Sequence, residues 1–182
     1  SPEEEARQLA DAKAWLGTKA GAGLHWISGP TELGGRGLPT AYENAYRSIE
    51  TRYEVPNQSF FGIGFGMVVP TILAHGTPET HAYLNRMRSG ELVGCQLFSE
   101  PGAGSDLAGL TTKAERDGDE WIVTGQKVWT SGAHYSDVGE IICRTDPDLP
   151  KHKGLTGFVV DMHAPGVTVR PLRQMTGGAA FN

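Results

Sequence analysis

The spacing of the apolar residues changes near Leu92, and no other feature of this sequence constrains the fold as strongly. Before that point, apolar residues recur at helical spacing in stretches that end at glycine or proline. After it, apolar residues form short runs, each bounded by Gly, Pro, Asp or Asn. Helices that precede strands, rather than alternate with them, predict an α+β fold or two separate domains.

Four helices are expected before Leu92. Ser1-Pro2-Glu3-Glu4 has the pattern of a capping box, and the helix that it starts is expected to end near Gly21. Thr40 is expected to cap the second helix and Thr77 to start the fourth. The third, over residues 61–74, is apolar nearly all round, so we expect it to be buried on most sides. The apolar stripe of the second helix is expected to be Ala41, Tyr42, Ala45, Tyr46 and Ile49.

Short strands are expected after Leu92. Asp117-Gly118 predicts a hairpin turn between strands over residues 111–116 and 121–124. The other apolar runs are expected to be antiparallel strands as well: 93–98, 125–131, 138–144, 155–161 and 167–172.

The composition excludes some classes of function. The 182 residues include 16 Lys+Arg against 21 Asp+Glu, a net charge of -5, which argues against a general binder of nucleic acid or anionic membranes. Cys95 and Cys143 lie in separate apolar runs, so we expect two buried thiols and a cytoplasmic location. Residues 55–78 carry no Asp, Glu, Lys or Arg, but prolines and glycines interrupt them. We therefore expect a buried helix there and no membrane span.

The stretch GCQLFSEPGAGSD, residues 94–106, joins an apolar run to a glycine-rich loop. Gly102 and Gly104 allow backbone N–H groups to converge, and such a concavity binds anions, above all phosphate oxygens. Ser99 and Ser105 add hydroxyl groups at the two ends of the loop. The acids Glu100 and Asp106 are expected to orient the loop through backbone N–H groups. Taken alone, the stretch fits an ordinary glycine-rich turn better than a binding site.

A second stretch, GQKVWTSG, covers residues 125–132. On a strand, Lys127, Trp129 and Ser131 would share one face. An indole beside hydroxyl groups suits a flat aromatic ligand, although a tryptophan packed in a sheet is commoner.

Other motifs carry less weight. Gly62-Ile63-Gly64-Phe65-Gly66 is a partial dinucleotide fingerprint, but Met67 takes the place of the last glycine and no strand precedes it. His75 and His81 are six residues apart, which is off the common metal-ligand spacing, so no metal site is expected.

Together and in this order, the two stretches Gln96–Asp106 and Gly125–Gly132 closely resemble the acyl-CoA dehydrogenase family. The resemblance implies a multidomain α+β protein: an α-helical N-terminal domain over residues 1–91 and an antiparallel β-barrel middle domain over residues 92–182. The C-terminal four-helix bundle of the family is absent from these residues. Because the final segment, 177–182, reads as a turn leading into a further strand, we expect the chain to be cut short before the bundle.

The resemblance also implies FAD as the cofactor and gives roles to particular residues. The segment Gln96, Leu97, Phe98 and Ser99 would run along the edge of the isoalloxazine ring. Gly104 and Ser105 would approach the pyrophosphate, and Ser105 would also touch the bound acyl-CoA. Trp129, Thr130 and Ser131 would flank the other side of the flavin. One departure is Gln96, where the family often has an aromatic or other bulky residue.

The implied reaction is α,β-dehydrogenation of an acyl-CoA thioester to the 2-enoyl-CoA, as in fatty-acid β-oxidation, with electrons passed to an electron-transferring flavoprotein. The family's catalytic carboxylate belongs to the C-terminal bundle, so none of Glu91, Glu100, Asp106 and Glu140 is identified as the base. A homo- or hetero-oligomer is expected for the full-length protein. Three alternatives stay open: a non-catalytic subunit that binds FAD or acyl-CoA in a mixed oligomer, an acyl-CoA oxidase, and a binding module without flavin.

Overall fold

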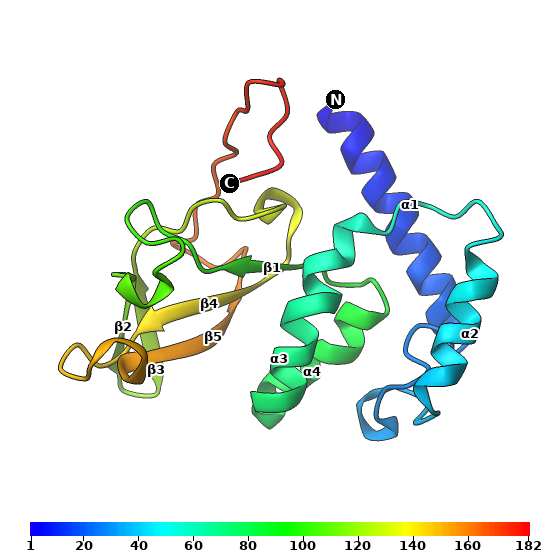
Figure 1. Cartoon of the computed structure of the whole chain (residues 1–182), viewed down its shortest axis with the longest axis horizontal. Coiled ribbons are helices and arrows are strands. Elements are labelled where there is room, and N and C mark those ends of the chain that lie inside the picture. Colours follow the sequence, from blue (N-terminus) through cyan, green and yellow to red (C-terminus); the bar gives the residue numbers. More distant parts are fainter. The chain divides into compact units, whose positions relative to one another are not determined.

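The computed structural model describes all of residues 1–182 and divides into two compact units, Ser1–Val93 and Gly94–Asn182. The first unit contains the helices and the second contains the sheet (Figure 1).

Four α-helices form the first unit: α1 (Pro2–Gly21), α2 (Thr40–Glu50), α3 (Val69–His75) and α4 (Pro78–Arg88). The predicted starts of α1 and α4 are confirmed. Ser1 Oγ accepts from Glu4 N at 3.2 Å, and Thr77 and Thr80 cap α4 reciprocally. The predicted cap of α2 is wrong by one residue, because Pro39 is the N-cap and Thr40 is the first helical residue.

The expectation of a regular helix over residues 61–74, buried on most sides, is wrong. A 3-10 turn at Ser59–Phe61 and a π-helical turn at Gly64–Val68 precede the shorter helix α3. Only one side faces the core, and Met67 and Leu73 are 40% and 39% exposed. No helix of the structure has the length and apolar character needed to cross a membrane.

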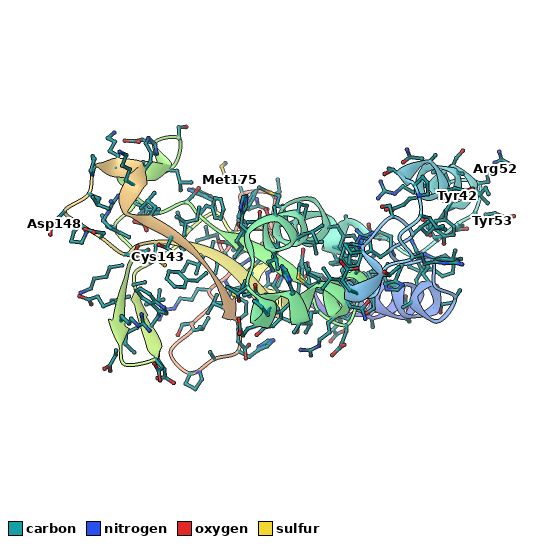
Figure 2. The ribbon with its side chains drawn as sticks, turned by 90° about the horizontal axis from the view of Figure 1, so that it is seen from below. Tyr42, Arg52, Tyr53, Cys143, Asp148 and Met175 are labelled. Carbon is teal, nitrogen blue, oxygen red and sulfur yellow. The ribbon has the colours of Figure 1, made fainter.

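The predicted apolar stripe of α2 is also wrong. Tyr42 and Ile49 are 59% and 52% exposed, and the buried residue of this helix is Glu43. Tyr42 projects into solvent with Arg52 and Tyr53, which follow the helix (Figure 2).

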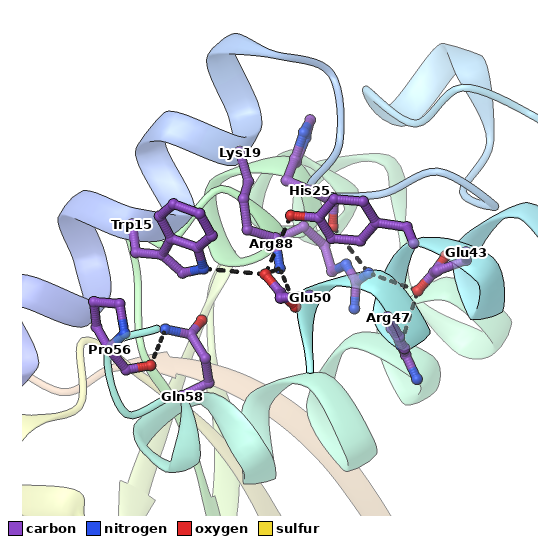
Figure 3. Close-up of polar contacts among 10 residues, drawn as sticks. Trp15, Lys19, His25, Glu43, Arg47, Glu50, Pro56, Gln58 and Arg88 are labelled. Carbon is purple, nitrogen blue, oxygen red and sulfur yellow. Dashed lines mark hydrogen bonds and ion pairs between the residues drawn. The ribbon is translucent and has the colours of Figure 1, made fainter. Parts of the chain in front are cut away.

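Two carboxylates of α2 explain this orientation (Figure 3). Glu43 accepts from Ser28 N at 3.0 Å and pairs with Arg88 Nη2 at 3.4 Å, and Arg88 also donates to His25 O. Glu50 accepts from Trp15 Nε1 at 3.1 Å and from Lys19 Nζ at 3.0 Å. A buried carboxylate needs such partners, so the polar side of α2 turns inward.

The second unit is built on five strands: β1 (Gly94–Leu97), β2 (Lys113–Asp117), β3 (Glu120–Thr124), β4 (Val138–Arg144) and β5 (Leu155–Asp161). The predicted hairpin is confirmed, since β2 and β3 pair antiparallel around Gly118, whose φ is 61°. β4 and β5 also pair antiparallel.

The sheet is not the antiparallel barrel that the resemblance implied. It is open and mixed, in the order β1-β4-β2-β3 with β5 also on β4. β1 pairs parallel with β4, and β2 meets β4 in parallel at Lys113 and Arg144. The chain between β1 and β4 makes the glycine loop and the β2–β3 hairpin before it returns in the original direction, so these two strands run the same way.

Two predicted strands are absent. Residues 125–131 and 167–172 belong to no strand, and only isolated bridges join Ser131 and Leu172 to Phe181. Trp129 has a φ of 62°, in the left-handed region, which interrupts the extended chain. The two buried thiols are confirmed, since Cys95 and Cys143 are both buried and free.

Candidate functional site

The two glycine-rich stretches singled out in the sequence meet within the second unit. Val128 N donates to Ser99 O at 2.8 Å, and Lys127 Nζ donates to Phe98 O at 3.0 Å. Both stretches also line a cavity of about 260 Å³, formed by Glu100, Pro101, Gly102, Gly109, Thr111 and Gln126.

Strand β1 positions the first stretch. Gln96 and Leu97 are its last residues and pair with Glu140 and Ile141 of β4. Phe98 and Ser99 continue beyond the strand, and Ser99 is partly exposed.

The chain then turns tightly into the glycine loop. Glu100 N donates to Ala103 O at 2.8 Å, and Ala103 N donates back to Glu100 O at 3.1 Å. The N–H groups of Gly102, Gly104 and Ser105 make no hydrogen bond within the chain. A Cβ atom on Gly102 or Gly104 would meet no atom within 4 Å. The loop therefore presents free donors with open space above them, as an anion requires.

Glu100 supports the loop, as predicted. Its carboxylate accepts from Thr111 N at 2.7 Å, from Thr111 Oγ1 at 2.8 Å and from Thr112 N at 2.8 Å. It also pairs with Lys127 Nζ at 3.0 Å. Burial alone would raise the pKa of Glu100, but the hydrogen bonds from Thr112 and Thr111 lower it to about 2. A carboxylate this acidic is a poor proton acceptor at neutral pH.

The predicted role of Asp106 is wrong. It stands at the start of a 3-10 turn, Leu107–Gly109, but its side chain makes no capping hydrogen bond. Instead it forms an exposed ion pair with Lys151 Nζ at 3.3 Å. Such a pair contributes little to stability.

The second stretch differs from the predicted strand face. Lys127 points into the protein, with a side chain 6% exposed, whereas Trp129 is 62% exposed. The expectation that Lys127, Trp129 and Ser131 share one face is therefore wrong, because Trp129 adopts a positive φ. The indole meets the ring of Phe181 edge-on, with centroids 6.1 Å apart.

Asn182 holds the far end of the second stretch, a role that the sequence reasoning missed. Thr130 is buried and exchanges two backbone hydrogen bonds with Asn182, at 3.1 and 3.0 Å. The side chain of Asn182 donates to Thr130 O at 3.2 Å, while Ser131 stays exposed. No spacing pattern links residues 52 positions apart, so only the folded chain reveals this contact.

A second cavity, of about 500 Å³, is also lined by residues of the second stretch. Its walls combine Lys127, Val128 and Thr130 with Leu97 and Met162.

Comparisons with known proteins show the family of this chain. The family model described as acyl-CoA dehydrogenase, middle domain, matches residues 95–181. The acyl-CoA dehydrogenase IpdE1 of Mycobacterium tuberculosis is 42% identical over 182 residues, which is 100% of this chain and 47% of the relative. The chain belongs to the acyl-CoA dehydrogenase family.

Solved structures of the acyl-CoA dehydrogenase family share the fold. One described as the Tcur3481-Tcur3483 steroid ACAD has a TM-score of 0.76 and 35% identity, covering 93% of this chain and 44% of that chain. The ChsE4-ChsE5 complex from Mycobacterium tuberculosis has a TM-score of 0.74 and 33% identity, covering 100% and 47%. The chain therefore spans about half the length of these three relatives.

Proposed function

We propose that this chain carries the flavin-binding face of an FAD-dependent acyl-CoA dehydrogenase. The proposed enzyme converts an acyl-CoA thioester to the 2-enoyl-CoA and passes the electrons to an electron-transferring flavoprotein. The observation that carries the proposal is the meeting of the two stretches, which puts free loop amides and an exposed indole in one unit. Membership of the acyl-CoA dehydrogenase family supports the same reaction.

The residues present fit a flavin dinucleotide. The free N–H groups of Gly104 and Ser105 suit diphosphate oxygens, and no side chain occupies the space above the glycines. The exposed ring of Trp129 offers an apolar surface for a flat aromatic group. When bound, FAD supplies the acceptor for the two electrons of the dehydrogenation.

We propose for the chain's own residues the roles that the family resemblance implies. The segment Gln96–Ser99 would lie along the ring edge, where the Ser99 hydroxyl would donate a hydrogen bond. Trp129 would cover the ring and limit the access of water, with Thr130 and Ser131 beside it. Ser105 would also contact the acyl-CoA.

None of the four acids considered in the sequence analysis is proposed as the proton acceptor. Glu100 is unsuitable because its carboxylate is buried in an ion pair and its pKa is about 2. Glu91 is paired with Arg86, and Asp106 with Lys151. Glu140 lies buried within strand β4.

We infer that the acyl group is derived from a steroid rather than from a simple fatty acid. Support comes from the relative described as a steroid ACAD, which matches 93% of this chain. A second candidate function is a non-catalytic subunit of a mixed oligomer. The similarity of the whole chain to a chain of the ChsE4-ChsE5 complex supports the mixed oligomer in that possibility.

The test is a flavin assay on the purified full-length protein. We expect the protein to be yellow from bound FAD, and the colour to be bleached by steroid-type acyl-CoA in preference to linear acyl-CoA. A protein that is colourless and gains no flavin on reconstitution would contradict the proposal. Bleaching only after a second subunit is added would favour the mixed oligomer, and peroxide formation in place of dye reduction would indicate an oxidase.

A further inference from the structure

We propose that the buried ion pair of Glu100 and Lys127 positions the two site stretches against each other, so that both are positioning residues for the flavin. This inference rests on the proposed function, because it assigns the pair to the proposed flavin site. Neither residue is proposed to touch the cofactor.

The geometry places the pair at the junction of the two stretches. The side chains of Lys127 and Glu100 are 6% and 4% exposed, and Nζ lies 3.0 Å from Oε1. Nζ also donates to Phe98 O at 3.0 Å, so one ammonium group holds the backbone of the first stretch and its carboxylate together. The backbone bond from Val128 N to Ser99 O, 2.8 Å long, runs beside this contact.

The pair also fixes the first stretch relative to the sheet. The remaining acceptor positions of Glu100 take the N–H groups of Thr111 and Thr112, which lead directly into β2. One carboxylate therefore connects the glycine loop, the start of β2 and the second stretch. An apolar pair of equal volume would fill the same space, but it would not fix these directions.

Trp129 is the residue that depends most on this anchor. It lies two positions after Lys127 and has a φ of 62°, a conformation that a non-glycine residue keeps only when its surroundings enforce it. Lys127 holds the chain before it, and the paired hydrogen bonds of Thr130 with Asn182 hold the chain after it. Loss of Lys127 removes the contacts that hold the chain on the N-terminal side of Trp129.

The experiment compares Lys127→Met and Glu100→Gln with Lys113→Met in the full-length protein after removal of its flavin. Lys113 is a matched control, because its ion pair with Glu115 is 2.7 Å long but exposed, at 52% and 63%. The first measurement is the dissociation constant for FAD. The second needs no flavin: acrylamide quenching of Trp129 fluorescence, taken as the difference from the same variant carrying Trp129→Phe.

We expect the FAD dissociation constant to rise at least roughly tenfold in Lys127→Met and Glu100→Gln, and by less than about twofold in Lys113→Met. The quenching of Trp129 should change in the first two variants only. If Lys127→Met does not fold, Glu100→Gln, which keeps the shape of the side chain, decides the question alone.

Two results would overturn the inference and leave the proposed function standing. The first is that the variants fold and keep the wild-type FAD affinity and Trp129 quenching but have a lower melting temperature. The ion pair would then stabilise the fold without positioning the site. The other is an equal loss of FAD affinity in the Lys113→Met control. If the wild-type protein binds no FAD, the proposed function fails, and unchanged Trp129 quenching would then reject the positioning role as well.

Discussion

Replacing Gly125 with alanine should loosen the junction between the second stretch and β2. A Cβ atom on Gly125 would lie 2.6 Å from Thr112 Cβ and 2.7 Å from Thr112 Cα. Thr112 is 1% exposed and its N–H is bonded to Glu100, so it cannot move without disturbing that carboxylate. Overpacking of this kind costs about 1–3 kcal/mol.

Hydrogen exchange at the β2 amides of the full-length protein measures this loss. A cost of about 2 kcal/mol raises their exchange rates roughly 30-fold, because each 1.4 kcal/mol is about a factor of ten. The control is Gly157→Ala in β5, where the added Cβ meets no atom within 4 Å. Equal exchange rates at β2 in the Gly125→Ala and Gly157→Ala variants would refute the packing argument.

Three further outcomes follow from the buried charges and thiols. Arg88→Met removes the buried partner of Glu43, which keeps its contacts with Arg47 and Ser28, so urea unfolding should show a loss of about 1.5–3 kcal/mol in the free energy of unfolding. A loss below about 1 kcal/mol would be that of an exposed ion pair and would contradict this expectation. Burial raises the pKa of Cys95 and of Cys143 to about 11, so Ellman's reagent at pH 7 should modify neither until urea is added, and rapid labelling of the native protein would contradict their burial. The pKa of Glu100 in the folded protein is about 2, below its usual 4.5. The ionised carboxylate therefore contributes up to about 3 kcal/mol to the free energy of unfolding above pH 4.5, and this contribution is lost as the pH falls toward 2. The stability gap between wild type and Glu100→Gln should therefore narrow over that range, and a gap independent of pH would count against it.

The helices and the hairpin could be predicted because local signals determine them. Ser1 and Thr77 cap α1 and α4 within one turn, and Gly118 meets the backbone demand of a tight hairpin. The orientation of α2 could not be predicted in this way. Its apolar residues formed a convincing stripe, but the partners of Glu43 and Glu50 come from other helices and turn the polar side inward.

The same limit applies to the sheet and to the site. The pairing of β1 with β4 depends on the path of the chain after the β2–β3 hairpin. No local residue pattern predicts that path. In the second stretch, alternation predicted a strand, whereas Trp129 adopts a left-handed conformation between Lys127, which pairs with Glu100, and Thr130, which bonds to Asn182. Sequence reasoning thus identified the two stretches and the support from Glu100, but not the inward direction of Lys127.

The central claim is that residues 98–106 and 125–132 together hold FAD. Hydrogen exchange of the deflavinated full-length protein, with and without added FAD, tests it most directly. FAD should slow exchange in both stretches, above all at the free N–H groups of Gly104 and Ser105, and leave the hairpin turn at Asp117-Gly118 unchanged. Bound FAD that protects neither stretch would contradict the claim.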